Sequence, residues 1–441
     1  MLSLRFCTRL IRALSSAASG KPQFDNSIDF LSNVPHRKHP GILHLNIVRL
    51  PQEAEDAAKY ILKKCHIQGM EEHAAALSNY LWSRKRPIED TELRIKASAI
   101  EDEFKARLPD SEENTPAYKG KIKSQVLNAL RKQTYNWQPL SYTEQTATVY
   151  LAARFDGGYA AVTRALQEIR QRVPDFTPQT LLDFGSGVGS VSWAAHSIWG
   201  TSLKEYMCVD SSESMNQLNE LILRGGEETG DIGGQVQYDL VISAFSLNEL
   251  PNLSARQMNI RALWRKTGGF LVLVENGTRE GHQLLMEARE TILRVSDKEI
   301  WDHRPACIFA PCPHQLECPR LAESSKLPCN FVQQYHSLPL RWHPPHRWEK
   351  FSFLVFSRGT VSENGNQWPR VIGPVLSRPR HVHCHTCGAD GKLHHDVITP
   401  QRHGRDLYRC ARNCEWGDRL PALISHSTDP DTCENEKTND S

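Results

Sequence analysis

The feature that most restricts the fold of this sequence is a glycine-rich turn between a short apolar segment, 180–184, and a segment with helical spacing. Glycine is needed where the backbone turns tightly against a ligand, and the helix that follows offers free N–H groups to an anion. A dinucleotide-binding turn requires its third glycine at position 190, which is Ser190. The sequence therefore predicts a cofactor turn of a different kind. The cofactor-binding residues expected at this turn are Asp183, Gly185, Gly187 and Gly189.

A second acid lies in register with this turn. The predicted strand 206–209 ends at Asp210, about twenty residues beyond the glycines, where an acid accepts hydrogen bonds from ribose hydroxyls. Asp183, two residues before the first glycine, and the Gly-x-Gly-x-Gly spacing resemble the motif of Rossmann-like class I methyltransferases that use S-adenosylmethionine. The resemblance implies S-adenosylmethionine as a cofactor, with Asp210 on its ribose.

Strands alternate with helices after residue 180, which predicts an α/β fold with a parallel sheet covered on both faces by helices. The segment 224–237 is short and rich in glycine, so it is expected to supply a reduced third strand and adenine-side loop. A final antiparallel hairpin should close the sheet. The predicted strands are 180–184, 206–209, 238–244, 270–274, 331–338 and 351–356, and the predicted helices between them are 190–199, 213–224 and 254–264.

The predicted strand 238–244 runs into the segment 243–251, which shows no catalytic motif. Methyltransferases that act on amino groups carry Asp or Asn, two prolines and an aromatic residue at this place. Those that methylate a carbon atom of a nucleobase carry a nucleophilic cysteine. Neither pattern is present. Asn248 and Glu249 are interpreted as a polar pair that starts a helix, and no catalytic residue is predicted. The sequence supports binding of the cofactor better than its use.

The first residues predict the compartment. Residues 1–20 carry three arginines and several serines but no acid, which is typical of a mitochondrial presequence. No run of 18 apolar residues occurs, so insertion into a membrane is not expected. The matrix is reducing, and clustered cysteines there indicate metal ligands rather than disulfides.

Eight of the twelve cysteines lie between residues 307 and 414. Cys312, Cys318 and Cys329 could converge in a proline-stiffened loop, but a closed zinc or iron–sulfur site needs a fourth ligand. Spacing leaves two models open, because Cys387 could complete this set or could belong to a separate zinc site. That zinc site would consist of Cys384, Cys387, Cys410 and Cys414.

The charge of the chain restricts where RNA could bind. Because the net charge is only +2, a nucleic-acid surface must come from local segregation of charge. Residues 370–412 have a net charge of +5 and predicted strands at 381–385, 392–398 and 406–410, which indicates RNA contact through phosphates.

The predicted organisation has five parts. They are a presequence (1–20), a helical N-terminal domain with basic faces (40–175), a methyltransferase-like domain with a Cys-rich insertion at 307–329 (176–360), a small basic β-rich module (368–420) and a disordered acidic tail (425–441).

Together the segments 181–189, 243–251, 273–278 and 402–418 and the cysteine cluster closely resemble mitochondrial methyltransferase-like proteins that act on the small ribosomal subunit. The resemblance implies a small-subunit assembly factor that contacts rRNA, carries a 4Fe–4S cluster and lacks methyltransferase activity. By position, the resemblance places the cluster ligands at Cys312, Cys318, Cys329 and Cys387.

Three hypotheses follow. The first is an assembly factor in the mitochondrial matrix that binds small-subunit rRNA beside ribosomal proteins and other assembly factors. The second is an active S-adenosylmethionine-dependent methyltransferase of small-subunit rRNA. The third is a small-molecule methyltransferase with a structural zinc site, which would bind no RNA.

Overall fold

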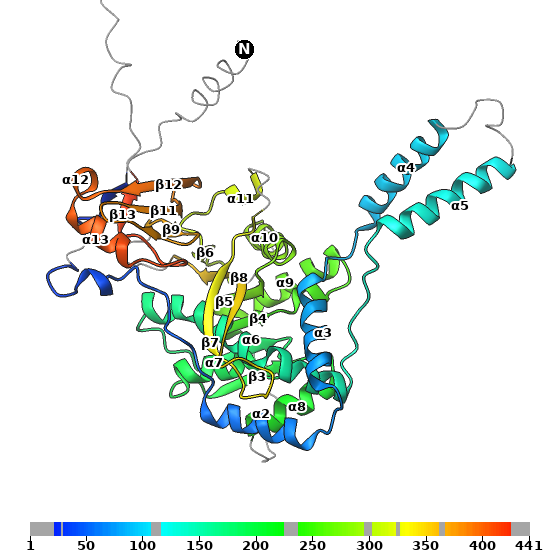
Figure 1. The fold of residues 1–441 in the computed structure, drawn as a ribbon, viewed down its shortest axis with the longest axis horizontal. Helices are drawn as coiled ribbons and strands as arrows, with labels where there is room; N and C mark the ends of the chain where they lie inside the picture. Colours follow the sequence, from blue (N-terminus) through cyan, green and yellow to red (C-terminus); the bar gives the residue numbers. More distant parts are fainter. Residues whose placement is uncertain are drawn as a thin grey trace, which may run out of the picture. The chain divides into compact units, whose positions relative to one another are not determined.

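The computed structural model describes residues 22–27, 30–106, 116–224, 237–294, 302–322, 327–360 and 367–424. The predicted presequence (1–20), most of the short 224–237 stretch and the predicted acidic tail (425–441) lie outside the described residues. The chain forms two compact units (Figure 1). The large unit consists of Leu45–Pro311 and Ser324–Val361, and the small unit of Met1–His44, Cys312–Glu323 and Ser362–Ser441.

The large unit is built on a mixed sheet in the order β3-β2-β4-β5-β8-β6, with β7 also paired to β8. The first four strands in this order are parallel, and β8 is antiparallel to β5, β6 and β7. The predicted parallel sheet and closing hairpin are therefore confirmed. The strands are β2 (Thr180–Phe184), β3 (Glu205–Val209), β4 (Tyr238–Ala244), β5 (Thr267–Asn276), β6 (Ala306–Ala310), β7 (Phe331–His336) and β8 (His346–Arg358).

Continuous apolar runs explain why the central strands form. Leu240, Val241 and Ile242 of β4 are fully buried although adjacent side chains point to opposite faces of the sheet. Both faces must therefore be covered, as in parallel sheets. The helices that connect the strands are α7 (Ser190–Trp199), α8 (Glu213–Arg224), α9 (Leu253–Lys266) and α10 (Arg279–Leu293).

The N-terminal helices belong to the large unit together with the sheet. The 29-residue α6 (Glu144–Arg172) is buried around most of its circumference and packs against α7, α3, β7 and β8. α4 (Asp90–Ala106) and α5 (Pro116–Gln133) form a hairpin with its own small core of Ile100, Ile122 and Val126. The remaining N-terminal helices are α2 (Gln52–Lys64) and α3 (Met70–Ser83).

In the small unit, a sheet in the order β10-β11-β12, with β9 also paired to β11, packs against α13. Its core contains Val382, Ile398, Leu407, Ala411 and Leu420. A separate pair of strands joins β1 to β13. The elements are β1 (Pro22–Phe24), η1 (His36–Lys38), α11 (Pro319–Ala322), β9 (Arg370–Val371), β10 (Leu376–Ser377), β11 (Val382–Cys387), β12 (Leu393–Ile398), α12 (Pro400–His403), α13 (Arg405–Asn413) and β13 (Ala422–Ile424).

Two predicted strands of this unit are confirmed as β11 and β12, but the predicted strand 406–410 is wrong. This segment is helical and forms most of α13. Leu407, Cys410 and Ala411 are buried three or four residues apart, which is the spacing of one helix face, and charged residues occupy the other face.

No helix among the described residues is long and apolar enough to cross a bilayer.

Candidate functional site

The glycine turn after β2 requires glycine at all three expected positions. Gly185, Gly187 and Gly189 have φ angles of 72°, 51° and 81°, a region that L-residues rarely adopt. The Gly185 N–H donates to the Val209 carbonyl at 2.7 Å, which ties the turn to the end of β3. Gly189 then lies directly before the first residue of α7. The turn therefore opens onto the N-terminus of a helix.

Asp210 lies at this turn, as the sequence predicts. Its Oδ2 accepts the Gly187 N–H at 3.0 Å, and its Oδ1 accepts the Ser212 N–H at 2.9 Å. Asp210 thus holds the turn closed through backbone hydrogen bonds. A carboxylate can accept about four hydrogen bonds, so acceptor capacity remains for ribose hydroxyls.

Asp183 is fully buried at the end of β2 and is only partly hydrogen bonded. Its Oδ2 accepts the Ser192 hydroxyl at 3.0 Å, while its Oδ1 has no hydrogen-bond partner among the described residues. Burial raises the pKa of Asp183 to about 7, against the hydrogen bond from Ser192, and the Asp210 charge adds to the rise.

The residues of this turn fit S-adenosylmethionine. An unsatisfied buried acceptor costs about 1–3 kcal/mol, so a ligand that brings a donor, such as an ammonium group, would remove a real penalty at Asp183. A side chain built on Gly187 would meet only the Gly185 carbonyl, at 3.9 Å, so the turn has open space on this side. S-adenosylmethionine would then lie against the turn residues that the sequence predicts.

The chain bends sharply where β4 ends. Phe245 is the one non-glycine residue of the described chain with a positive φ, 60°, and its N–H donates to the Val274 carbonyl. Asn248 and Glu249 follow in a 3-10 turn, η3 (Leu247–Glu249), rather than in the first turn of α9. Glu275 of β5 accepts the Leu247 N–H at 2.9 Å, and burial raises the pKa of Glu275 to about 8.

A residue that the sequence reasoning missed lies across this end of the sheet. Tyr142, just before α6, donates its hydroxyl to Glu249 Oε1 at 2.6 Å, and its carbonyl accepts the Ser212 hydroxyl at 3.0 Å. Burial raises the pKa of both Tyr142 and Glu249. No motif marks Tyr142, since only the fold brings it against η3 and the loop after β3.

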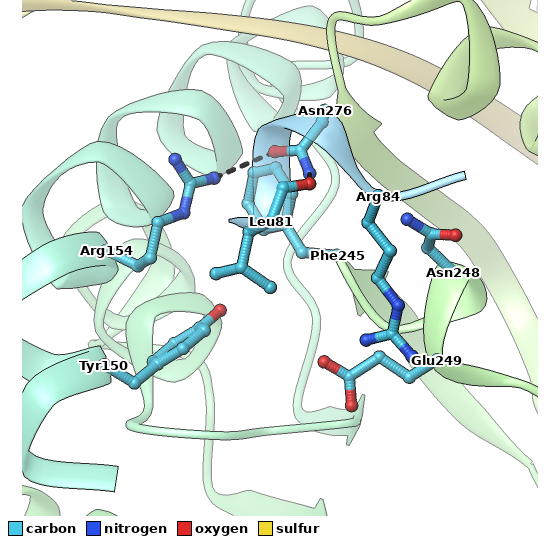
Figure 2. A pocket seen from close by; sticks show the side chains of 8 residues that line it. All are labelled: Leu81, Arg84, Tyr150, Arg154, Phe245, Asn248, Glu249 and Asn276. Atoms are coloured by element: carbon cyan, nitrogen blue, oxygen red, sulfur yellow. Dashed lines mark hydrogen bonds between the residues drawn. The ribbon is translucent and has the colours of Figure 1, made fainter. Parts of the chain in front are cut away.

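The space left at the end of β4 is a cavity of about 10 Å³, and Figure 2 shows the side chains around it. A cavity of this size holds about one water molecule. In Figure 2 the Arg84 guanidinium points toward Glu249, and Arg154 donates to Asn276 at 3.1 Å. The lining residues are Leu81, Arg84, Tyr150, Arg154, Phe245, Asn248, Glu249 and Asn276.

Direct contacts with neighbouring residues hold two of these arginines in place. Arg154 donates to Glu349 Oε1 at 2.9 Å, and both side chains are 5% exposed. Arg84 donates one N–H to the Gln138 carbonyl at 3.0 Å and lies over the Trp137 ring. These contacts fix two of the side chains that line the cavity at the end of β4.

Three of the four predicted cluster cysteines belong to the small unit, and Cys329 belongs to the large unit. Cys318 and Cys387 are buried and Cys312 is partly buried. Cys387 Sγ lies 3.4 Å from His314 Nε2. Among the described residues, no three His, Cys, Asp or Glu side chains form a group that could hold a metal ion. The four-cysteine site therefore stays a prediction.

The alternative zinc site does not fit the fold. Cys384 and Cys387 both lie within β11, where residues three apart point to opposite faces and cannot converge on one ion. Cys384 and Cys414 belong to the apolar core of the small unit. Burial raises the pKa of Cys384 and Cys410 to about 12.

The strand order, the glycine turn after the first parallel strand and the acid after the second define a methyltransferase-like protein with a Rossmann-type α/β fold. The family model for the mitochondrial small ribosomal subunit protein Rsm22 matches residues 144–421. The chain belongs to this mitochondrial family.

Named relatives agree with the family assignment. The human mitochondrial ribosome assembly protein METTL17 is 50% identical over 96% of this chain and 94% of its own length. The mitochondrial ribosome assembly protein RSM22 of Saccharomyces cerevisiae is 21% identical over 63% of this chain and 67% of its own. An Rsm22-cox11 tandem protein of Schizosaccharomyces pombe is 27% identical over 79% of this chain, which spans 53% of the relative.

Solved structures that resemble this one include methyltransferases. Magnesium protoporphyrin IX methyltransferase from Synechocystis with bound S-adenosylmethionine has 17% identity and a TM-score of 0.28, and the match covers 57% of this chain and 100% of that one. A putative RNA methyltransferase from Pyrococcus horikoshii has 14% identity and a TM-score of 0.27, with 45% and 83% covered.

Proposed function

We propose that this protein is an assembly factor of the mitochondrial small ribosomal subunit. It acts in the matrix, binds small-subunit rRNA and works beside ribosomal proteins and other assembly factors. Membership of the Rsm22 family supports the ribosomal role, since the human and yeast relatives are named as ribosome assembly proteins. In this proposal the methyltransferase-like sheet is a scaffold that transfers no methyl group.

The observation that carries the scaffold proposal is the filled space after β4. A methyl acceptor must reach the end of this strand, but Tyr142 and Glu249 are hydrogen bonded there and the remaining cavity has a volume of about 10 Å³. A nucleobase is many times larger than one water molecule. To admit a base, the chain would have to break this partly buried hydrogen bond between Tyr142 and Glu249.

A basic surface on α5 of the large unit supports RNA contact. α5 carries five basic residues and no acidic one, and none of the five forms an ion pair with a described residue. Unpaired exposed cations are suited to phosphates, because binding releases the condensed counterions of the RNA. The exposed cations of α5 are Lys119, Lys121, Lys123, Arg131 and Lys132.

The proposal includes a 4Fe–4S cluster held by Cys312, Cys318, Cys329 and Cys387. Thiolates are the ligands that such clusters take, and the family resemblance supports this set. Cys318→Ser should lose bound iron and acid-labile sulfide together with small-subunit association. Cys307→Ser is the matched control, because Cys307 lies close in sequence but outside the proposed set. Retention of iron by Cys318→Ser would contradict the cluster proposal.

A second candidate function is methylation of small-subunit rRNA with S-adenosylmethionine as cofactor. The unsatisfied Asp183 Oδ1 favours it, because this atom gives the glycine turn a reason to bind a donor-bearing cofactor. Binding alone would not distinguish the two candidates, since a scaffold could retain its cofactor.

The deciding experiment measures small-subunit abundance on gradients from cells that lack the protein and express Gly187→Arg. The arginine should fill the open side of the turn. Gly359→Arg is the control, because Gly359 also has a positive φ, 78°, but lies away from the turn. Rescue by both variants supports the scaffold. Failure of a folded Gly187→Arg alone supports the second candidate, and loss of an rRNA methyl group would then establish it.

A further inference from the structure

The pattern of β11 separates two faces of the sheet in the small unit. Val382 and Cys384 are fully buried and contribute to the core against α13. His383 and His385 alternate with them and therefore point to the opposite face. His385 is exposed and His383 is partly exposed. The outer face of this sheet is thus built from imidazole rings rather than from the usual charged side chains.

These rings form a column with a histidine of the next strand. The His385 and His395 rings are 4.3 Å apart at an angle of 9°, and the His383 and His395 rings are 5.4 Å apart at 23°. His381 closes one end edge-on, 5.1 Å from His383. The other end is the outer face of His385, and no ring of a described residue is recorded against it.

Apolar side chains extend the same face. Val397 of β12 and Leu376 of β10 both pair with His383 in the sheet register, so all three lie side by side. Val397 is 40% exposed and Leu376 is 50% exposed. This histidine face, formed by Leu376, His383, His385, His395 and Val397, is therefore an exposed platform of rings and apolar groups.

Cations surround the histidine face. Arg378, Arg380 and Lys392 are exposed at the turns that border it, and Arg320 of α11 acts electrostatically on His385. Desolvation and the neighbouring positive groups lower the pKa of His383. The nearest acid in β12, Asp396, is partly buried and accepts a hydrogen bond from Thr386. The surroundings therefore suit an anionic chain.

A metal ion is a poorer occupant of this face. Nitrogen lone pairs lie in the plane of an imidazole ring, so two parallel rings direct them side by side instead of toward one point. In addition, His383 Nδ1 lies 3.2 Å from His395 Nε2, so each of these two rings has one nitrogen within hydrogen-bond distance of the other ring. Consistent with this geometry, the described residues contain no group of three ligands that could hold a metal ion.

We propose that the histidine face binds single-stranded RNA, with a base stacked on the outer ring face of His385 and phosphates against the bordering arginines. Bases stack on aromatic side chains irrespective of their sequence, and exposed sheets with rings serve this purpose in RNA-binding modules. This inference rests on the proposed function and names a surface within it. It predicts a preference for unpaired over duplex RNA.

The test uses the full-length protein and two RNA oligonucleotides of equal length, one single-stranded and one duplex, at about pH 8, where imidazole is neutral. Binding is followed by fluorescence anisotropy. His385→Gln should weaken single-strand binding about tenfold and leave duplex binding unchanged, because one stacked base contributes about that much. His385→Tyr should restore it, since tyrosine also offers a ring.

The chain offers a matched control. His336 and His346 form another cross-strand pair, with ring centroids 4.5 Å apart, on β7 and β8 of the large unit. Replacing both by Gln should change neither affinity. Equal loss for single-strand and duplex RNA in His385→Gln would overturn the inference, as would unchanged binding of single-stranded RNA by this variant. If the wild-type protein binds neither RNA, the proposed rRNA binding itself fails.

Discussion

Asp183→Asn should change how stability depends on pH. In the folded protein Asp183 is fully buried with one carboxylate oxygen unsatisfied, and its pKa rises from an ordinary 3.8 to about 7. The folded state therefore binds this proton more tightly than the unfolded state. Stability is greatest below the unfolded pKa and falls as pH rises toward the folded pKa.

The size of the effect follows from the pKa. Each pH unit between the pKa of the unfolded state and that of the folded state costs about 1.4 kcal/mol. The charged Asp183 therefore destabilises the fold by about 4 kcal/mol in total. About 2 kcal/mol of this loss should develop between about pH 5 and about pH 7. Asn does not ionise, so the variant should gain that amount relative to wild type over the same range.

The assay is urea unfolding at a series of pH values, with hydrogen exchange of β2 and β4 peptides to report on the large unit. The measured quantity is the difference in free energy of unfolding between Asp183→Asn and wild type. Ser192→Ala is the companion variant. It removes the donor to Asp183 Oδ2, so its stability should fall over a range that extends to higher pH than in wild type. A difference that does not vary with pH would refute the reasoning.

Three further perturbations test other parts of the structure. Arg154→Met should destabilise the large unit by about 3–5 kcal/mol in urea unfolding, because it leaves the buried Glu349 carboxylate without its cation. Changing Lys121 and Lys123 to Gln should lower the slope of log affinity for RNA against log salt by about 1–2, unless α5 does not touch phosphates. Gly41→Ala should unfold the small unit at lower temperature, since a Cβ there collides with the Arg419 carbonyl; an unchanged melting temperature would contradict this packing.

The sheet of the large unit was predictable because its signals are local. Strands β2 and β4 and helices α7 and α8 have the predicted bounds, since each apolar run is bordered by a glycine turn, an acid or a polar loop. The glycine turn was predictable for the same reason, because its closely spaced glycines and Asp183 come from one stretch of chain. Asp210 required only the rule that parallel strands end at the same edge of the sheet.

The prediction of a strand at 406–410 failed because the segment is short. Five residues show an apolar period only weakly, but Leu407 and Cys410 are three apart and therefore share a face in a helix and not in a strand. The helix forms because Ala411 extends the buried stripe, which packs on the core face of the sheet that contains β11 and β12. Packing against the sheet, and not the local pattern, selects the period.

By itself, the sequence determined the α/β class, the glycine turn, the family and the pattern of cysteines. Only the tertiary structure decided that Tyr142 is hydrogen bonded to Glu249 at the end of β4 and that the rings of His385 and His395 stack. It also decided that Asp183 Oδ1 has no hydrogen-bond partner among the described residues. Each of these contacts joins residues from separate elements. Their geometry depends on strand register and helix packing, which no local spacing encodes.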